Sequence, residues 1–316
     1  MKTVRLEPVA ETIYRPVPSR IDIAPHGFVQ YLDHMGSDET IVEAARTSTG
    51  KGFISWEPYE RCEGCGAVRD AGDARTGGSQ FCDHQWKPYP RGDHGILEYM
   101  YKNRHETPAE MPVIRTLWKA PIFVFRQLHR HRAASYNEAS ARYMQLPNDF
   151  YAPKLEEVLG QSKTNKQGSE GALHPHAAGN FLVSLEDEQK SAYREYEQAL
   201  KDGIAPETAR MVLPNTIYSV CMIQMNLRMD LHMLGLRDDS HAQGITQEYA
   251  RAQAAFTQAL FPRWYALYEE YTKYAVRLSR SETMLLRGIL SNCAGPTDSS
   301  PQWSDEAKAL MKRLTR

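Results

Sequence analysis

The chain has 316 residues, of which 41% are hydrophobic and 24% charged, and its formal net charge is −1. This composition is typical of a globular protein with one large domain or two smaller ones, and the near-neutral charge argues against a general nucleic-acid binder. No apolar run reaches the length of a membrane span, and the N-terminus lacks the apolar core of a secretion signal. Five cysteines, an odd number, do not suggest a disulfide framework, so we expect a reducing, cytoplasmic setting.

The N-terminal half predicts a mixture of strands and helices. Residues 1–26 predict an irregular arm that contains Pro8, Pro16 and Pro18, and residues 51–93 are rich in Gly, Pro and polar side chains, as in an inserted module. Between and after these segments, apolar spacing predicts regular elements. We expect strands at 27–36 and 111–119, and helices at 39–48, 95–104 and from Pro121 to about His129.

The second half predicts mostly helix. Ser184 and Asp187 resemble a capping box, followed by an apolar stripe that ends at Gly203. Residues 160–172 predict a mobile loop. Further helices are expected at 206–214, at 217–234 with Gly235 as the C-terminal cap, and at about 245–260 before Pro262.

A cationic stretch stands out in this neutral chain. Residues 126–142 carry four arginines against Glu138 alone, a local charge of +3. The arginines alternate with small residues, hydroxyls and histidines rather than with neutralising glutamates, and the planar guanidinium suits a phosphate. The pattern predicts a site for a phosphorylated small molecule; solvated surface charge or a subunit contact is the alternative.

The same stretch resembles a known family. RHRAAS, residues 130–135, matches the RHRxxS signature of flavin-dependent thymidylate synthases, and the match extends through SYNEASARY. Other blocks resemble that family in the expected order: HETPAE (105–110), PIFVFRQ (121–127), ETARMVLP (207–214) and LRDDSHAQ (236–243). The resemblance covers 27–50 and 94–275, leaving the insert and the C-terminal tail aside.

This resemblance implies an α/β (α+β) fold, a mixed sheet with long helices. It also implies a catalytic domain over 27–275 with an insert at about 51–93, preceded by the arm of residues 1–26 and followed by an extension at 276–316. The chain shows no GxGxxG after a strand, so its flavin is not expected on a Rossmann turn.

The family methylates C5 of dUMP with methylenetetrahydrofolate as carbon donor, and FAD relays a hydride from NADPH. It forms homotetramers with active sites between subunits. One alternative within the family is the UMP/dUMP C5-methylase of polyoxin-type nucleoside antibiotic biosynthesis. An alternative of another class is a nucleotide- or zinc-binding interaction protein without catalysis.

The resemblance assigns substrate-binding residues along the chain. Arg237 matches the catalytic arginine thought to stabilise a deprotonated uracil N3, and three other arginines would hold the phosphate. Ser140 has no base beside it in sequence, so we expect a positioning role rather than a nucleophile. Glu138 could instead pair with neighbouring arginines, and Arg210 could be a helix-surface residue. The matched positions are Gln127, Arg130, Glu138, Ser140, Ala141, Arg142, Arg210 and Arg237.

The resemblance also assigns the flavin contacts. Met111 follows HETPAE where the family often has histidine, and His232 stands where some members have asparagine. His241, taken alone, would more often be a hydrogen-bonded structural histidine. The matched positions are Ser48, Thr107, Glu110, Arg130, His131, Arg132, Ala133, Asn226, Arg228, His232 and His241.

The insert carries four potential metal ligands. RCEGCG (61–66) and FCDHQW (81–86) supply Cys62, Cys65, Cys82 and His84, a set that suits tetrahedral zinc. A reduced surface loop or a redox-labile CxxC pair are the alternatives. Five basic and five acidic residues cancel between 58 and 91, which argues against a nucleic-acid finger. Cys221 and Cys293 are expected to be ordinary thiols.

Overall fold

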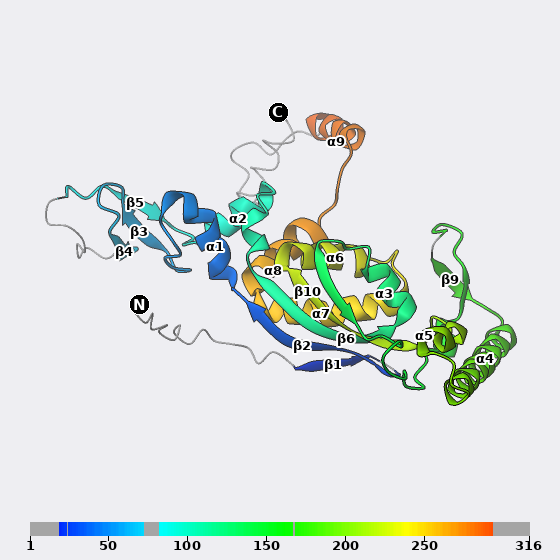
Figure 1. Ribbon diagram of the computed structural model, residues 1–316. Helices are drawn as coiled ribbons and strands as arrows, with labels where there is room; N and C mark the ends of the chain where they lie inside the picture. Colours follow the sequence, from blue (N-terminus) through cyan, green and yellow to red (C-terminus); the bar gives the residue numbers. More distant parts are fainter. Residues whose placement is uncertain (1–18, 24, 73–81, 167, 293–316) are drawn as a thin grey trace, which may run out of the picture. The chain divides into compact units, whose positions relative to one another are not determined.

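The computed structural model describes residues 19–23, 25–72, 82–166 and 168–292. The chain divides into two compact units, Met1–Lys273 and Tyr274–Arg316, and the described part of the second unit contains helix α9 (Figure 1). The first unit is built on a five-stranded sheet of order β1-β2-β6-β10-β7. Its strands are β1 (Arg20–Ile23), β2 (Gly27–Met35), β6 (Val113–Pro121), β10 (Tyr218–Asn226) and β7 (Ala134–Glu138).

The predicted α/β class of fold is confirmed. Every strand pairing in the described part of this sheet is antiparallel, rather than of both directions as a mixed sheet would have. In β6, Ile114, Thr116 and Trp118 are buried while the residues between them are half-buried. This alternation of period two gives the sheet one core face.

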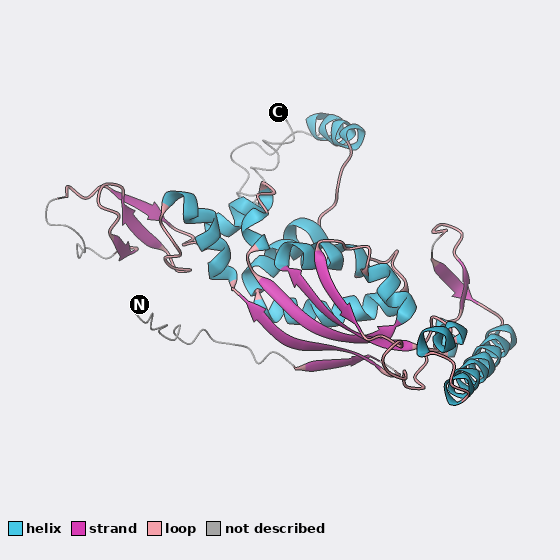
Figure 2. Cartoon of the chain, viewed as in Figure 1, coloured by secondary structure: helices cyan, strands magenta, loops and turns pink. Residues whose placement is uncertain are grey.

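Helices cover that core face (Figure 2). In α7, Tyr249 stacks on Trp118 of β6 with ring centroids 5.5 Å apart, and its hydroxyl donates to the Lys119 carbonyl at 2.6 Å. A Cβ at Gly27 would lie 1.9 Å from that hydroxyl, so the start of β2 requires glycine. The helices are α1 (Asp38–Arg46), α2 (His94–Lys102), α3 (Ile122–Leu128), α4 (Pro175–Lys201), α5 (Pro206–Ala209), α6 (Leu227–Arg237), α7 (Gly244–Leu260), α8 (Pro262–Tyr268) and α9 (Arg280–Asn292).

Short helical turns and hairpins connect these elements. A π-helical turn, Glu269–Lys273, follows α8. The loop expected at 160–172 contains a two-stranded hairpin, β8 (Leu159–Gln161) with β9 (Ser169–Ala172). The 3₁₀ turns are Thr47–Thr49, Thr107–Glu110, Leu155–Glu157 and Arg210–Val212. None of the helices in the described ranges combines the length and apolar character needed to cross a membrane.

The helix predicted at 217–234 is wrong in its first half. Residues 218–226 form β10, and α6 begins only at Leu227, where the Asn226 side chain accepts from the Met229 amide at 2.9 Å. Val220 and Met222 point away from the core face but are apolar. The sequence of β10 therefore lacks the alternation of apolar and polar residues that predicts a strand. Asn226 is the N-terminal cap that separates strand from helix.

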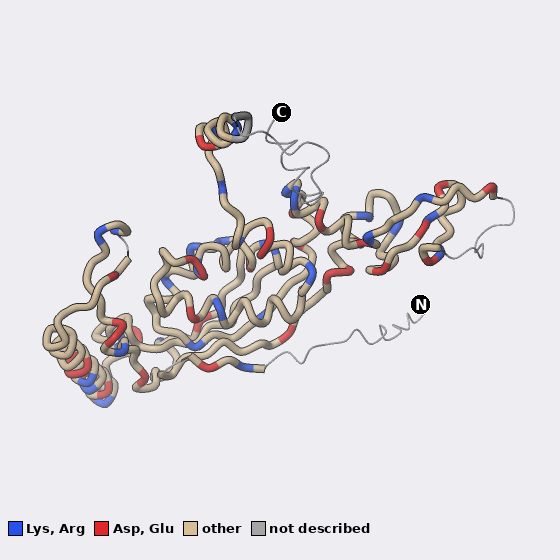
Figure 3. Tube along the Cα trace, turned by 180° about the vertical axis from the view of Figure 1, so that it is seen from behind, with Lys and Arg blue, Asp and Glu red and all other residues tan. Residues whose placement is uncertain are grey.

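The capping box expected at Ser184 is also wrong. Helix α4 begins at Pro175, and Ser184 lies in its interior. The predicted end is confirmed, because α4 stops at Lys201 and Gly203 adopts a left-handed conformation with φ of 81°. Acidic and basic residues are interspersed along α4 (Figure 3).

Two further strands of the five-stranded sheet lie where no strand was predicted. β1 falls inside the expected N-terminal arm, of which residues 1–18 are outside the described part. β7 lies within the cationic stretch and pairs with β10, with Ala134 opposite Met225 and Glu138 opposite Cys221. Cys221 is a buried free thiol, while Cys293 is outside the described residues.

The insert forms a small three-stranded sheet of its own. Its order is β4-β3-β5, with β3 (Tyr59–Cys62) in the middle between β4 (Val68–Asp70) and β5 (Trp86–Tyr89). Only Tyr59 and Cys62 are buried along these strands. The sheet therefore has very little apolar core of its own.

Candidate active site

A cavity of about 360 Å³ lies between the turn that precedes β7 and helix α6. On α6, Met229, His232 and Leu236 follow each other at spacings of three and four residues, so they share one face of the helix. The lining residues are Arg130, His131, Arg132, Ala133, Met229, His232, Leu236 and Arg237. The structure thus brings the RHRA segment together with two predicted residues of α6, His232 and Arg237.

Hydrogen bonds from the His131 amide and the Tyr136 hydroxyl hold the turn that carries the RHR segment. The His131 amide donates to the Leu128 carbonyl at 2.9 Å, which continues the end of α3. The Tyr136 hydroxyl donates to the carbonyls of Leu128 (2.8 Å) and His131 (3.1 Å). These bonds position the turn, and His131 is only 4% exposed.

His131 and Arg237 form the inner wall of the cavity. Arg237 donates from Nε to Nε2 of His131 at 3.1 Å and from Nη2 to the Gln127 carbonyl at 2.9 Å. Since a guanidinium only donates, His131 accepts at Nε2 and carries its proton on Nδ1. Burial, then the charges of Arg237 and His232, lower the pKa of His131 to about 4, so the ring is neutral near pH 7.

The cavity carries uncompensated positive charge. Arg130 and Arg132 are exposed, and neither forms an ion pair with a carboxylate among the described residues. Burial lowers the pKa of Arg237, but a guanidinium stays protonated at neutral pH. Three cations and two imidazoles around one cavity favour an anionic ligand.

A second group of predicted residues lies at the same end of the sheet. Arg228, in the first turn of α6, pairs with Glu106 at 2.9 Å and also with Glu110. These pairs join the HETPAE block, with Thr107, to the helix that follows Asn226. Ser48 lies exposed in the 3₁₀ turn after α1, and α1 packs against the HETPAE turn.

His241 is held outside the cavity. Its Nδ1 lies 2.6 Å from the Asp239 carboxylate, and its amide donates to the same oxygen at 2.8 Å. The His241 side chain is exposed, and its assignment as a flavin contact stays a prediction. The Gln127 side chain similarly donates to the Gln243 side chain at 2.8 Å, and the Gln127 backbone carbonyl accepts from Arg237.

A third group lies beyond the other end of β7. Ala141 is buried, and Nε of Arg142 lies 3.5 Å from the Glu207 carboxylate of α5. Helix α5 ends at Ala209, directly before Arg210. Glu138 forms no ion pair with an arginine in the described ranges, so a simple salt-bridge role is not supported. At about 3.3 Å per residue, the five-residue strand separates this group from Arg130 by more than about 13 Å of backbone.

Ser140 serves the local turn. Its Oγ accepts from the Arg142 amide at 3.3 Å, and its carbonyl accepts from the Tyr143 amide at 3.0 Å. Among the residues that the structure describes, no basic side chain hydrogen-bonds to Oγ. Positioning of the chain, rather than nucleophilic attack, fits this arrangement.

Four site residues were missed from the sequence. Met229 and Leu236 line the cavity, Tyr136 fixes the RHR turn, and Glu207 pairs with Arg142. The two on α6 repeat with His232 at helical spacing, which a helix starting at Leu227 would have revealed. The tyrosine and the glutamate gave no signal, because their partners are brought near only by the fold.

Comparison with known proteins decides the family. A family model described as thymidylate synthase complementing protein matches residues 30–263. A flavin-dependent thymidylate synthase of Thermus thermophilus is 38% identical over 274 residues, covering 87% of each chain. That of Wolbachia pipientis is 34% identical over 268 residues, covering 85% of this chain and 82% of the relative.

The chain belongs to the flavin-dependent thymidylate synthase family. The family predicted from the RHRAAS block is therefore confirmed, and the chain is an enzyme of the methyltransferase class. A solved structure of the UMP/dUMP methylase PolB from Streptomyces cacaoi, bound with 5-Br dUMP, superposes with a TM-score of 0.60. It is 28% identical and covers 81% of this chain and all of that one. The same methylase bound with 5-Br UMP gives 0.60 at 26% identity, covering 79% and 96%.

Proposed function

We propose that this flavin-dependent thymidylate synthase converts dUMP to dTMP, with methylenetetrahydrofolate as carbon donor and NADPH as reductant. The observation that carries the proposal is the cavity lined by Arg130, Arg132 and Arg237, whose charges have no carboxylate partner in the described part of the chain. A nucleotide phosphate and a flavin are both anionic, so either would relieve this charge.

The cavity also fits FAD in the chemistry of its donors. His131 and His232 present imidazoles with ring centroids 6.0 Å apart, and Arg132 and Ala133 leave the rim open. Arg130, His131, Arg132, His232 and, from the neighbouring group, Asn226 and Arg228 would hold the cofactor. Bound FAD supplies the hydride chemistry, while the protein supplies position and field.

Arg237 is the proposed catalytic residue. With Nε and Nη2 held by His131 and Gln127, it keeps Nη1 without a protein partner among the described residues. A cation fixed in this way needs no reorganisation to stabilise negative charge that develops on the pyrimidine ring. The neutral state of His131 avoids a second positive charge directly against the guanidinium.

We further propose that each active site forms between subunits of a homotetramer. Support comes from the two ends of β7: the phosphate clamp expected from Arg130, Arg142 and Arg210 has one member at one end and two at the other. A second chain would supply the missing members.

UMP is the competing substrate, because the PolB structures contain both 5-Br dUMP and 5-Br UMP. The curated thymidylate synthases, at 38% identity over 87% of both chains, favour dUMP. A binding protein that has lost catalysis is not supported, since Arg130, Glu138, Arg142, Arg210 and Arg237 are all present.

A direct assay tests the proposal. Purified protein should be yellow with bound FAD and should methylate dUMP when given NADPH and methylenetetrahydrofolate. UMP, run in parallel, should be converted at least about tenfold less efficiently, because a site shaped for one sugar rejects an added hydroxyl. A protein that binds flavin but prefers UMP would overturn the choice of substrate; one that binds no flavin would overturn the cofactor.

A further inference from the structure

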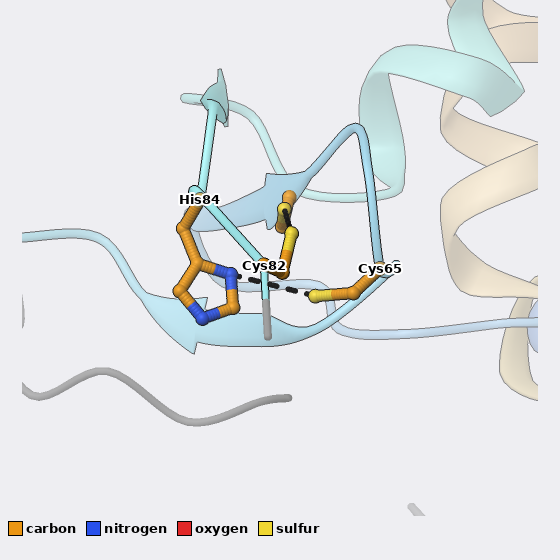
Figure 4. A group of neighbouring side chains, drawn as sticks. Cys65, Cys82 and His84 are labelled. Atoms are coloured by element: carbon orange, nitrogen blue, oxygen red, sulfur yellow. Dashed lines mark hydrogen bonds between the residues drawn. The ribbon is translucent and has the colours of Figure 1, made fainter. Parts of the chain in front are cut away.

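The insert gathers four metal-ligating side chains at one point. Cys62, Cys65, Cys82 and His84 each place a ligand atom within 4.8 Å of the other three. The Cys62 and Cys82 sulfurs are 3.6 Å apart, and the Cys65 sulfur is 3.4 Å from Nδ1 of His84. The labelled side chains converge on one another from separate stretches of the insert (Figure 4).

Two of these distances, between Cys62 and Cys82 and between Cys65 and His84, match edges of a zinc tetrahedron. Bonds of about 2.3 Å to sulfur and about 2.0 Å to nitrogen imply edges of about 3.8 Å between sulfurs and about 3.5 Å between sulfur and nitrogen. The measured 3.6 Å and 3.4 Å agree with these edges to about 0.2 Å. A disulfide needs its sulfurs at about 2.05 Å, so the geometry does not correspond to a cystine.

The backbone around Cys62 is shaped to present its sulfur. The Cys62 amide donates to the Ala67 carbonyl at 2.9 Å, and the Gly66 amide donates to the Cys62 carbonyl at 3.1 Å. Gly66 has a φ of 75°, in the left-handed region. A Cβ at Gly64 would lie 3.0 Å from the Cys82 sulfur, so this turn passes directly against the cluster. Close approach of this kind favours glycine.

The second pair of ligands is fixed separately. The His84 ring stacks on Trp86 with centroids 5.1 Å apart, and the Arg69 guanidinium covers the same indole at 4.2 Å. The Glu63 amide donates to the Gln85 carbonyl at 3.0 Å, which ties the two ligand segments together. The imidazole is therefore oriented by contacts outside the ligand set.

We propose that Cys62, Cys65, Cys82 and Nδ1 of His84 bind one structural zinc ion. Four protein ligands complete a tetrahedron and leave no open position for substrate, which distinguishes a structural from a catalytic site. The small sheet has only Tyr59 and Cys62 buried along its strands, so a metal supplies the stability that its core lacks.

The zinc site connects to the catalytic domain through β3. The Tyr59 hydroxyl donates to Asp93 at 2.8 Å, and Arg46 donates to Asp93 at 2.6 Å and 2.9 Å and to the tyrosine hydroxyl at 2.9 Å. Arg46 ends α1, directly before the turn that holds Ser48. The metal thereby holds one side of the scaffold that positions this proposed flavin contact.

Metal analysis of the full-length protein tests the site. Protein purified without chelator should contain about one zinc per chain, and Cys65→Ser and His84→Asn should each retain less than about a tenth of that. Cys221→Ser and His176→Asn are matched controls on residues outside the cluster, and should keep the metal. Zinc below about 0.2 per chain in fully reduced wild-type protein, or undiminished zinc in both ligand variants, would overturn the proposal.

Two further measurements cover variants that fail to fold. Wild-type protein exchanged with Co²⁺ should show the intense visible absorption of tetrahedral thiolate coordination, whereas a spectrum of octahedral Co²⁺ would refute the ligand set. Alkylation should spare three thiols until a chelator is added. If these thiols still resist alkylation after chelation, and the mass of the protein is lower by two hydrogens, the cluster contains a disulfide instead.

Discussion

At the residue scale, the Arg237 guanidinium is held in the wall of the cavity by two hydrogen bonds. Two of its three nitrogens are engaged by His131 and by the Gln127 carbonyl, so its position does not depend on the ligand. Preorganised charge of this kind acts on the transition state without further ordering. Substitution should therefore affect turnover more than binding.

Arg237→Ala should lower kcat by about 10²–10³-fold, as for removal of one preorganised electrostatic group. The dissociation constant for dUMP should rise much less, because Arg130, Arg142 and Arg210 are proposed to hold the phosphate. Rapid-quench turnover and equilibrium dUMP binding separate these effects. Arg287→Ala, an exposed arginine of α9, is the control and should leave both unchanged. Equal loss of binding and turnover would assign Arg237 to simple substrate binding.

Several site residues could be predicted individually, but their pairing could not. The RHRAAS block named Arg130, His131 and Arg132, and the LRDDSHAQ block named Arg237. The bond between His131 and Arg237 joins residues 106 positions apart, and no local pattern encodes such a contact. The neutral histidine follows from that contact and from burial, both of which depend on the fold.

At the scale of elements, a buried ion pair joins the insert to α1. Asp93 is fully buried and Arg46 is 6% exposed, and the carboxylate accepts from Arg46, the Tyr59 hydroxyl and the Ile54 amide. Loss of one charge from such a pair leaves the other buried without compensation.

Asp93→Asn should lower the free energy of unfolding by about 3–5 kcal/mol, because it leaves the Arg46 charge unpaired. The matched control is Asp33→Asn, whose partner Arg115 lies on the surface with side chains 42% and 53% exposed. That change should cost less than about 1 kcal/mol. Urea unfolding at one fixed protein concentration compares the two; equal losses would contradict a special role for the buried pair.

The elements that sequence predicted correctly have simple periodicity. β2, β6, α1, α2 and α7 each show one buried face, and their observed ends lie within about two residues of the predicted ones. The prediction of β10 failed because Val220 and Met222 make its second face apolar as well. No element was predicted for β7, because its residues were interpreted only as part of the cationic stretch. Tertiary pairing, rather than local preference, decides both strands.

At the scale of the whole molecule, the chain separates groups that one nucleotide would have to contact together. Arg130 precedes β7 and Arg142 follows it, with Arg210 near the latter through Glu207. Sites shared between subunits would bring these arginines together from two chains. Two inactive variants should then recover activity when their chains are mixed in one assembly.

Co-expression of Arg130→Ala and Arg142→Ala chains tests this arrangement. Each variant alone should be inactive, but randomly mixed assemblies should recover about a quarter of wild-type activity, because one site in four draws both intact arginines from different chains. Tagged purification followed by the dUMP assay measures the recovery. The control mixture, Arg142→Ala with Arg210→Ala, should stay inactive since both changes affect the same end of β7. No recovery in the first mixture would place the whole site in one chain.

The placement of arginines at both ends of β7 also has a consequence for inheritance. If a cell carries one intact and one doubly substituted copy, with Arg130 and Arg142 both replaced, mixed assemblies lose sites on either side of each defective chain. Only about a quarter of the sites then keep both arginines, although half of the chains are intact. If the sites are shared between subunits as proposed, a defective allele of this enzyme would thus be partially dominant.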